Sequence, residues 1–479
     1  MMPRFKIAHL AVIATLIPGC MMVGPDYKRP EVNVPPKYSG ADSTQALNEA
    51  EVSNSWWQLY QDAVLNELVE KALKNNTDVK LAVAKVEESD AYLREVGAAL
   101  LPEVDLSSSG SRSRVSQLGS TPLPAGYEPT NNTFSGQLST SFELDFWGHL
   151  RRAKESARAQ ALSTRYAKDT VDLSLKGLVV TNYLLLRSLE AQIVLTEDSL
   201  KSREESLALT KRRLLGGVSS GLDVEQAQVA SSNLVAQVAD LKRQREIAEH
   251  QLAVLTGDLA LTIPAGTLDS LPIPPTPPVG LPSSLLAARP DIRQSEASMI
   301  AANANIGVAK AALFPTISLT ANYGGQSADL SDLLKSAARI WTGGLSLNLP
   351  IFDAGRLDAR VDQASAKQKQ ALASYESSIQ TGFKEVSDAL VTLSRASERE
   401  AALQISKDAS KRALTIAENR YKSGYSGFLE VLDSQRTYND AALAYIQSRQ
   451  SRLSASVDLF KALGGGWKDP QPQQAMAKE

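Results

Sequence analysis

The sequence predicts an α+β membrane protein in which a few amphipathic β-strands accompany exceptionally long helices. The prediction rests on period-two alternation in each half of the chain, on two stretches of about 68 residues without proline, and on an internal repeat of about 207 residues. Lys and Arg total 51 against 53 Asp and Glu, and this balance argues against a nucleic-acid partner. One cysteine and three histidines leave little material for disulfides, zinc or haem, so we expect no metal or other cofactor.

The first predicted element is an export signal over residues 1–19. Arg4 and Lys6 precede an apolar stretch that is too short to span a bilayer as a mature helix. Cys20 ends a segment that resembles a bacterial lipoprotein box, which implies that Cys20 carries a covalent lipid such as palmitate. The alternative is an ordinary signal-peptidase site with an apolar Cys20. No later stretch approaches 18 unbroken apolar residues, so a membrane crossing must use strands.

The internal repeat organises the rest of the chain. Ala99–Pro102 corresponds to Ala312–Pro315, and Gly148 corresponds to Gly355. The offset is 213 before the strand region and 207 after it, because the second copy is shorter in a loop. The expected divisions are an extended anchor segment (20–60), a first repeat (61–262), a proline-rich strap (263–290), a second repeat (291–466) and a flexible tail (467–479).

Each repeat is predicted to contain a helix, a β-hairpin and then long helices. The hairpins are expected at about 103–146 and 316–352, where apolar and polar residues alternate. The polar positions are Ser, Thr, Asn and Gln, which suit a water-filled lumen. An ordinary soluble sheet with one wet face is the competing interpretation. The features against it are the aromatic residues that bracket the alternating segments, which are Phe134, Trp147, Trp341 and Phe352.

These aromatic residues predict the two interfaces of a membrane. Eleven residue steps of about 3.3 Å, tilted by about 40°, reach roughly 28 Å, close to the apolar band of outer-membrane barrels. Four strands leave two open edges, and unpaired backbone groups cannot face hydrocarbon without a large cost. The sheet must therefore close with other copies. Two copies would give eight strands and three would give twelve, and both satisfy closure.

Two uninterrupted helices are predicted from Gly148 to about Leu215 and from Gly355 to about Lys422. Each would extend about 100 Å. Glycine-containing turns follow, and shorter helices should return antiparallel and end near Thr256 and Leu463. Apolar residues spaced by three and four along these segments predict coiled-coil packing.

Several motifs in order then show that the chain resembles the TolC/OprM family of outer-membrane channels, nearer its lipid-anchored drug-efflux branch. The motifs are Val23–Pro30, Trp56-Trp57, Arg289–Ile292, Pro350–Arg356, Leu432–Arg436 and Ala462–Trp467. The resemblance implies a homotrimer with a twelve-stranded barrel in the cell outer membrane and a helical coiled-coil tunnel through the periplasm. It also implies a periplasmic adaptor and an inner-membrane pump, expected to be proton-driven, as partners.

The implied function is a passive exit duct for drugs and small toxic solutes. Protein secretion or metal-ion efflux through the same kind of channel is an alternative, as is a structural lipoprotein that bridges periplasmic layers. The resemblance places a periplasmic gate on Leu429, Asp433 and Arg436, with supporting contacts between helices from Arg420 and Tyr421. Spacings of four and three put the gate residues on one helix face.

The first repeat departs from the gate pattern. It has Asp223, with Ala227 and Gln228 in the same stretch, and it has no arginine equivalent to Arg436.

One motif in the chain is typical of hydrolytic enzymes: Gly217–Gly221 fits the G-x-S-x-G pattern. That motif requires a preceding strand and a downstream histidine, whereas a helix precedes it here and His250 lies inside another helix. The sequence therefore predicts a protein that is not an enzyme.

Overall fold

A computed structural model describes residues 22–32, 34–35, 38, 52–116, 126, 128–277 and 284–470. The chain divides into two compact units. The sheet unit comprises Met1–Pro30, Val86–Ser163 and Ser295–Tyr375, and the core unit comprises Glu31–Lys85, Thr164–Gln294 and Glu376–Glu479. Four helices pass from one unit into the other, so each unit is described by itself. The predicted signal and Cys20 lie outside the described residues.

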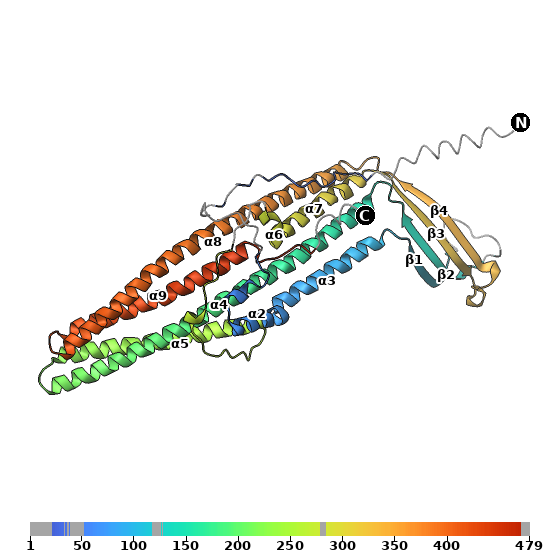
Figure 1. The fold of residues 1–479 in the computed structure, drawn as a ribbon. Coiled ribbons are helices and arrows are strands. Elements are labelled where there is room, and N and C mark those ends of the chain that lie inside the picture. Colours follow the sequence, from blue (N-terminus) through green and yellow to red (C-terminus); the bar gives the residue numbers. More distant parts are fainter. Residues whose placement is uncertain are drawn as a thin grey trace. The chain divides into compact units, whose positions relative to one another are not determined.

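The elements follow one another in the order shown in Figure 1. The helices are η1 (Trp56–Tyr60), α2 (Ala63–Asn75), α3 (Thr77–Ala98), α4 (His149–Leu215), α5 (Gly221–Thr256), η2 (Leu268–Ser270), α6 (Leu285–Ala288), α7 (Pro290–Ala311), η4 (Leu330–Asp332), η5 (Ser336–Ala338), α8 (Arg356–Lys422) and α9 (Phe428–Ala462). The strands are β1 (Glu103–Arg114), β2 (Thr130–Glu143), β3 (Thr316–Ser327) and β4 (Arg339–Asn348).

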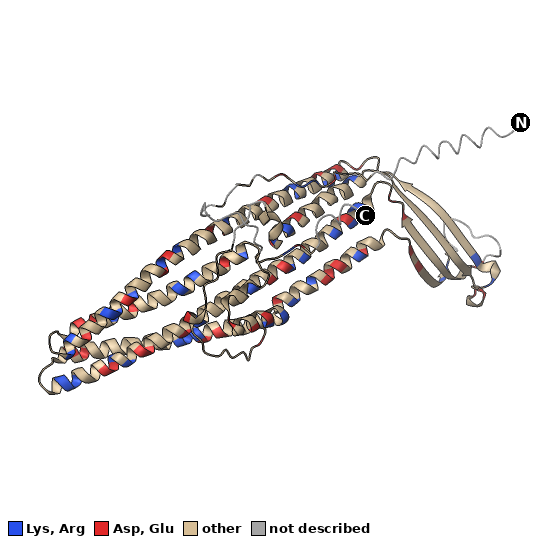
Figure 2. Ribbon diagram, in the orientation of Figure 1, with Lys and Arg blue, Asp and Glu red and all other residues tan. Residues whose placement is uncertain are grey.

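The sheet unit contains one antiparallel sheet with the order β1-β2-β3-β4. Glu103 lies opposite Ser141, and Thr316 lies opposite Asn348. Charged residues are concentrated on the helices, and the strands carry few of them (Figure 2). A sheet with so few charges is suited to an environment that does not hydrate it on both faces.

The long helices begin and end where the sequence predicts, because no proline interrupts α4 or α8. The strand ends differ. The alternation continues to Phe146, but β2 ends at Glu143, because the Asp145 carboxylate accepts hydrogen bonds from the first amides of α4 at Leu150 and Arg151. Asp353 caps α8 in the same way by accepting from Leu357.

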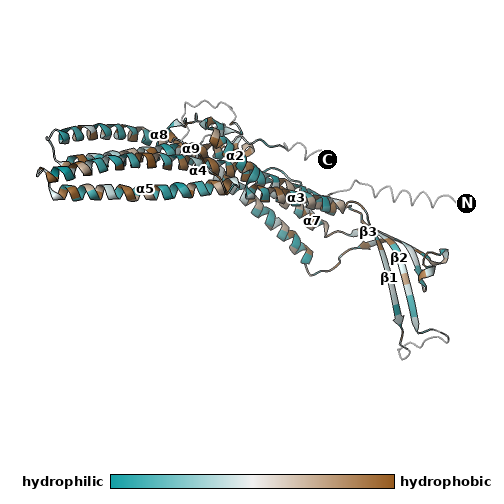
Figure 3. Cartoon of the chain, turned by 90° about the horizontal axis from the view of Figure 1, so that it is seen from below, coloured by the Kyte–Doolittle hydropathy of each residue, from teal (hydrophilic) through white to brown (hydrophobic). Residues whose placement is uncertain are grey.

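The core unit is built around buried apolar side chains from both halves of the chain. Trp56 and Tyr60 are fully buried, and the Trp56 ring stacks on Phe460 with 5.3 Å between the centroids. Along α5, α8 and α9, apolar and polar residues alternate at helical spacing (Figure 3). One described helix, α4, has an 18-residue window apolar enough to cross a membrane, but 56% of that window is buried inside the protein. Packing within the core therefore accounts for this apolar stretch.

Two predicted boundaries need correction. The anchor segment was expected to be extended to residue 60, yet Trp56–Tyr60 forms the short helix η1, because its aromatic side chains enter the core. The tail was expected to be flexible from residue 467. Its first described residues are held in place, since Trp467 Nε1 donates to Asp169 and the Asp469 carboxylate accepts from Tyr166 and Arg293. Residues 471–479 lie outside the described part.

Candidate functional sites in the strands and at the helix ends

The strand register collects the apolar side chains on one face of the sheet. Leu138 lies opposite both Leu106 and Tyr323, and Tyr323 lies opposite Trp341. These side chains are exposed, with Leu106 77% and Trp341 78% accessible. Other exposed residues of this face are Val104, Leu319, Leu345 and Leu347. Such a contiguous apolar surface requires lipid or another protein to cover it.

The opposite face of the sheet is polar. Ser109 and Ser135 share a hydrogen bond of 2.8 Å, and Ser318 and Ser346 share one of 2.6 Å. Ser139 lies opposite Asn322 between them. One face therefore suits hydrocarbon and the other suits water, as in a barrel wall around an aqueous lumen.

Both outer strands of the sheet have a free edge among the described residues. The sheet order leaves β1 paired only with β2 and β4 paired only with β3. The described residues of β1 and β4 are all exposed. A free edge offers unpaired backbone groups to another strand, so each edge is a site for association.

The four aromatic residues predicted at membrane interfaces have different surroundings. Trp341 is exposed in β4, and Phe352, beyond the end of β4, is 90% exposed. Phe134 is half-buried within β2. Trp147 lies beyond the end of β2, where its ring stacks on Phe314 with 4.7 Å between the centroids and its Nε1 donates 2.9 Å to the Pro315 carbonyl. These contacts hold Trp147 against the start of β3.

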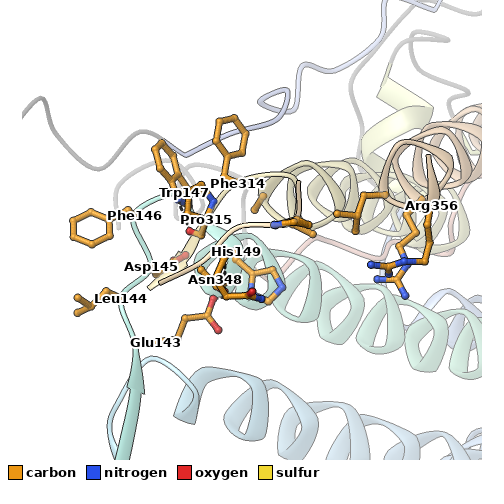
Figure 4. Close-up of a pocket in the computed structure, with 16 residues that line it drawn as sticks. Glu143, Leu144, Asp145, Phe146, Trp147, His149, Phe314, Pro315, Asn348 and Arg356 are labelled. Atoms are coloured by element: carbon orange, nitrogen blue, oxygen red, sulfur yellow. Dashed lines mark hydrogen bonds and ion pairs between the residues drawn. The ribbon is translucent and has the colours of Figure 1, made fainter. Parts of the chain in front are cut away.

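A cavity of about 210 Å³ lies where the strands end and α4 and α8 begin. Glu143 points toward His149, and Arg356 lies on α8 at another side of the cavity (Figure 4). The His149 Nδ1 is 3.2 Å from the Glu143 Oε1. Glu143 and Asn348 belong to the polar face of the sheet, so the cavity opens beside the hydrophilic surface.

The predicted gate residues lie at the start of α9. Leu429 is 65% exposed. An Arg436 Nη2 donates 2.8 Å to an Asp433 oxygen, and both side chains are largely exposed. Within one chain this is an ordinary i,i+3 ion pair that contributes a few tenths of a kcal/mol. The Arg420 Nε lies 3.3 Å from the Glu430 Oε1, which links the end of α8 to the start of α9.

Tyr421 has different surroundings from the exposed residues of the predicted gate. It is 6% exposed and packs in a small core with Leu207, Ala227, Ala417, Phe428 and Val431. The Arg213 guanidinium lies 4.5 Å from the centroid of the Tyr421 ring. The contact joins the last turn of α4 to the last turn of α8. The ends of the two helical hairpins are therefore tied together within one chain.

The first hairpin turn is closed by a capping box. The Asp223 amide donates to the Ser220 hydroxyl, and the Asp223 carboxylate accepts from the Ser220 amide and the Ser219 hydroxyl. These hydrogen bonds lower the pKa of the Asp223 carboxyl. Ala227 is buried in the core of the hairpin ends, so this position supports packing and carries no charge.

Two arginines near the predicted gate were missed. Arg213 corresponds to Arg420 in the predicted repeat, and this correspondence could have identified it. Arg203 on α4 is 8% exposed, and burial lowers the pKa of its guanidinium while the Asp440 carboxylate opposes that shift. Gln435 on α9 donates to the Ser206 hydroxyl of α4 at 3.2 Å. Helix α9, which carries the predicted gate residues, thus contacts α4 through polar groups, and the periodicity of apolar residues does not predict such a contact.

Comparisons with known proteins agree with this geometry. The family described as outer membrane efflux protein matches residues 68–258 and 281–465. The chain is 37% identical to the probable efflux pump outer membrane protein TtgC of Pseudomonas putida, over 98% of this chain and 97% of that protein. It is 34% identical to the cation efflux system protein CusC of Escherichia coli, over 95% and 98% of the two chains.

A solved structure is also similar. The open state of the Neisseria gonorrhoeae MtrE outer membrane channel superimposes with a TM-score of 0.84 and 32% identity, covering 94% of this chain and all of that one.

Proposed function

Because the chain belongs to the outer membrane efflux protein family, we propose that it is the outer-membrane channel of a tripartite efflux system. It is located in the outer membrane and acts as a passive exit duct rather than an enzyme. One observation supports this function above the others: the exposed apolar face and the hydrophilic face belong to the same four strands. A sheet with these two faces separates lipid from water.

The channel is a homotrimer in this proposal. Four strands cannot close a barrel around a lumen, and both edges of the sheet must be satisfied in hydrocarbon. Three copies supply twelve strands, which leave room for a pore, whereas eight strands enclose an interior that side chains fill. The exposed apolar residues along the helices, such as Val194 and Ile405, are then available to pack against neighbouring copies.

The partners are a periplasmic adaptor and an inner-membrane pump that supplies the energy. A covalent lipid on Cys20 adds a second attachment to the outer membrane. The docked segment that follows supports this arrangement, because the Val23 amide donates 3.0 Å to the Trp147 carbonyl at the foot of the sheet. The chain therefore holds the residues after Cys20 beside the strand ends.

The periplasmic end of the channel is closed by Leu429, Asp433 and Arg436. Three copies of this exposed face around a common axis place a ring of leucines beside rings of carboxylates and guanidiniums. Opening is a shift of the packed helices toward an arrangement that the partners bind more tightly. Separating α9 from α4 at the hydrogen bond between Gln435 and Ser206 costs little free energy, because water replaces this hydrogen bond.

Drugs and small solutes are the proposed cargo. A cation cargo is the second candidate, because CusC is named a cation efflux protein. Thioether relays carry soft metals in an open path, and the described methionine of α7, Met299, is 1% exposed. This burial favours the first candidate.

The proposal is tested by purifying the full chain in detergent and measuring particle mass and single-channel conductance in a lipid bilayer. A hollow trimer that conducts small ions supports the channel. A monomer that remains soluble without detergent would overturn it.

A further inference from the structure

The two hairpins of the sheet share one register rule. Each β3 residue stands 213 positions after its β1 counterpart, and each β4 residue stands 207 positions after its β2 counterpart. The pair Glu103 and Ser141 thereby corresponds to Thr316 and Asn348, which lie opposite each other. Residues that are paired in the β1–β2 hairpin therefore have counterparts that are paired in the β3–β4 hairpin.

The junction between β2 and β3 has no counterpart among the described strands of one chain. Its equivalent would join β4 to β1, which are the two outer strands of the sheet. We propose that β4 of one copy pairs with β1 of the next copy in the register of the β2–β3 junction, an inference that rests on the proposed channel. Ser139 lies opposite Asn322 in that junction, so Ser346 lies opposite Ser109 of the next copy.

This register keeps both faces of the sheet continuous. Leu349 meets Leu106 of the next copy on the apolar face, and Ser346 meets Ser109 on the polar face. A shift of the pairing by one residue would place Leu106 on the polar face and would interrupt both surfaces. A shift by two residues leaves every side chain on its own face, so another feature must distinguish the proposed register from registers shifted by two residues.

The ionic groups at the foot of the sheet supply that selection. In the junction inside the chain, Glu143 lies opposite Ser318 and contacts His149 at 3.2 Å. The corresponding residues between copies are Pro350 for Glu143, Asp105 for Ser318 and Arg356 for His149. Between copies, β4 therefore lacks the carboxylate that β2 carries at Glu143, but the facing strand β1 supplies one at Asp105. Arg356, in the first turn of α8, takes the position that His149 has in the first turn of α4.

Asp105 of one copy and Arg356 of the neighbouring copy are both available to form an ion pair across the junction. Asp105 is exposed and has no ion-pair partner among the described residues of its own chain. Arg356 is 55% exposed, and its nearest carboxylate is Asp353 at 3.9 Å, at the limit of an ion pair. Arg360, one turn further along α8, lines the same cavity and adds positive charge. Asp105 of one copy thus pairs with Arg356 of the copy beside it.

Disulfide trapping in the full lipid-anchored chain tests the register. The sequence has one cysteine, Cys20, which precedes all four strands. The predicted pairs are Ser109→Cys with Ser346→Cys on the polar face and Ser108→Cys with Leu347→Cys on the apolar face. The matched control is Ser109→Cys with Asn348→Cys, shifted by two residues. Directly opposite positions should link about tenfold more than shifted ones under mild oxidation, because diagonal Cβ atoms are too far apart.

The outcomes separate the register from the function. Covalent trimers on a non-reducing gel from the predicted pairs support the register. Preferential linking of the shifted pair overturns the register while leaving the channel intact, and so does an intact trimer that links through neither predicted pair. A monomer that links through no pair overturns the proposed function itself.

Charge reversal tests the ion pair. Asp105→Arg and Arg356→Asp should each lower the fraction of trimer that survives mild heating in detergent, and the double variant should restore it. Asp329→Arg, in the loop between β3 and β4, changes the charge equally away from this junction and should have no effect. Failure of the double variant to restore the trimer, with single variants that are impaired, overturns the ion pair.

Discussion

The Arg213 guanidinium covers the Tyr421 ring at 4.5 Å, and its Nη1 donates 3.4 Å to the Tyr421 carbonyl. One side chain at the end of α4 therefore contacts both the ring and the backbone at the end of α8. The two helical hairpins are joined at their tips by this contact. We therefore expect the proposed gate residues on α9 to move only together with these helix tips.

Replacement of Arg213 by alanine should loosen the tip. The contact contributes about 1 kcal/mol from the cation–π interaction and the hydrogen bond together. Amide hydrogen exchange in the last turn of α8 should accelerate about fivefold, and the conductance of the channel should rise. Arg212→Ala is the control, because the Arg212 side chain is exposed and makes no contact of this kind among the described residues. Equal exchange rates in both variants would contradict the role of Arg213.

The double replacement Asp433→Ala and Arg436→Ala should raise single-channel conductance. It removes the charged rings that the proposed trimer forms at its periplasmic end, while the stability of one chain changes by less than about 1 kcal/mol. Arg395→Ala with Glu398→Ala removes an equally exposed i,i+3 ion pair from α8 and should leave conductance unchanged. An unaltered conductance in the gate variant would remove this gate assignment.

The capping box of α5 should depend on pH. The pKa of Asp223 is lowered in the folded chain, so ionised Asp223 stabilises the fold above the ordinary carboxyl pKa of 3.8, and this contribution is lost as the pH falls below it. At pH 7, Asp223→Ala should destabilise the start of α5 by about 1 kcal/mol. Hydrogen exchange of the Leu222 and Asp223-position amides measures the change.

That pH dependence has a direct control. Glu225→Ala removes a carboxylate from the same turn without removing the capping hydrogen bonds, so it should have a smaller effect at pH 7. The difference between wild type and Asp223→Ala should shrink progressively as the pH falls below 3.8, because the stabilisation is lost as the pH passes through the lowered pKa of the folded chain. A difference that stays unchanged throughout this acid range would show that the charge of Asp223 is irrelevant.

Gly266→Ala should destabilise the core unit. A Cβ atom at Gly266 would lie 2.5 Å from the Arg187 Cζ. Arg187 cannot retreat easily, because it is 3% exposed and donates 2.7 Å hydrogen bonds to Glu190 and to the Pro264 carbonyl. We expect a loss of about 1–3 kcal/mol in the free energy of unfolding.

Thermal unfolding checks this prediction against a second glycine. Gly177 lies inside α4, where an added Cβ would meet Lys461 at an ordinary 3.5 Å. Gly177→Ala should therefore be neutral or stabilising by up to about 1 kcal/mol. If Gly266→Ala unfolds at the wild-type temperature, Arg187 is less constrained than its contacts indicate.

The long elements and the two faces of the sheet were predictable because they depend on repeating patterns. The helix bounds at His149–Leu215 and Arg356–Lys422 follow from the absence of proline, and the face of Leu138 follows from period-two alternation. The end of β2 was not predictable to the residue. Asp145 fits the strand pattern equally well, but its carboxylate caps a helix, and such a side-chain hydrogen bond has no periodic signal.

The contacts of single residues were the least predictable part of the candidate sites. Tyr421 was selected as a residue that joins helices, but its contact with Arg213 could not be predicted, because Arg213 lies 208 residues away. Trp147 was identified from its position at the end of a strand, whereas its stacking on Phe314 depends on a second strand far along the chain. The alternation of apolar and polar residues identifies which side chains share a surface, but it does not identify the residues from other parts of the chain that contact that surface.

The bare edges of β1 and β4 have a consequence for biogenesis. A newly exported chain reaches the outer membrane with an exposed apolar sheet face. The outer edges of β1 and β4 also carry unpaired backbone amides and carbonyls. Such a species is prone to aggregate, so assembly of the proposed trimer would need a chaperone that shields the strands until the other copies arrive. Folding of the strands and association of the copies would then be coupled, and overproduction beyond the capacity of this chaperone would yield insoluble chains.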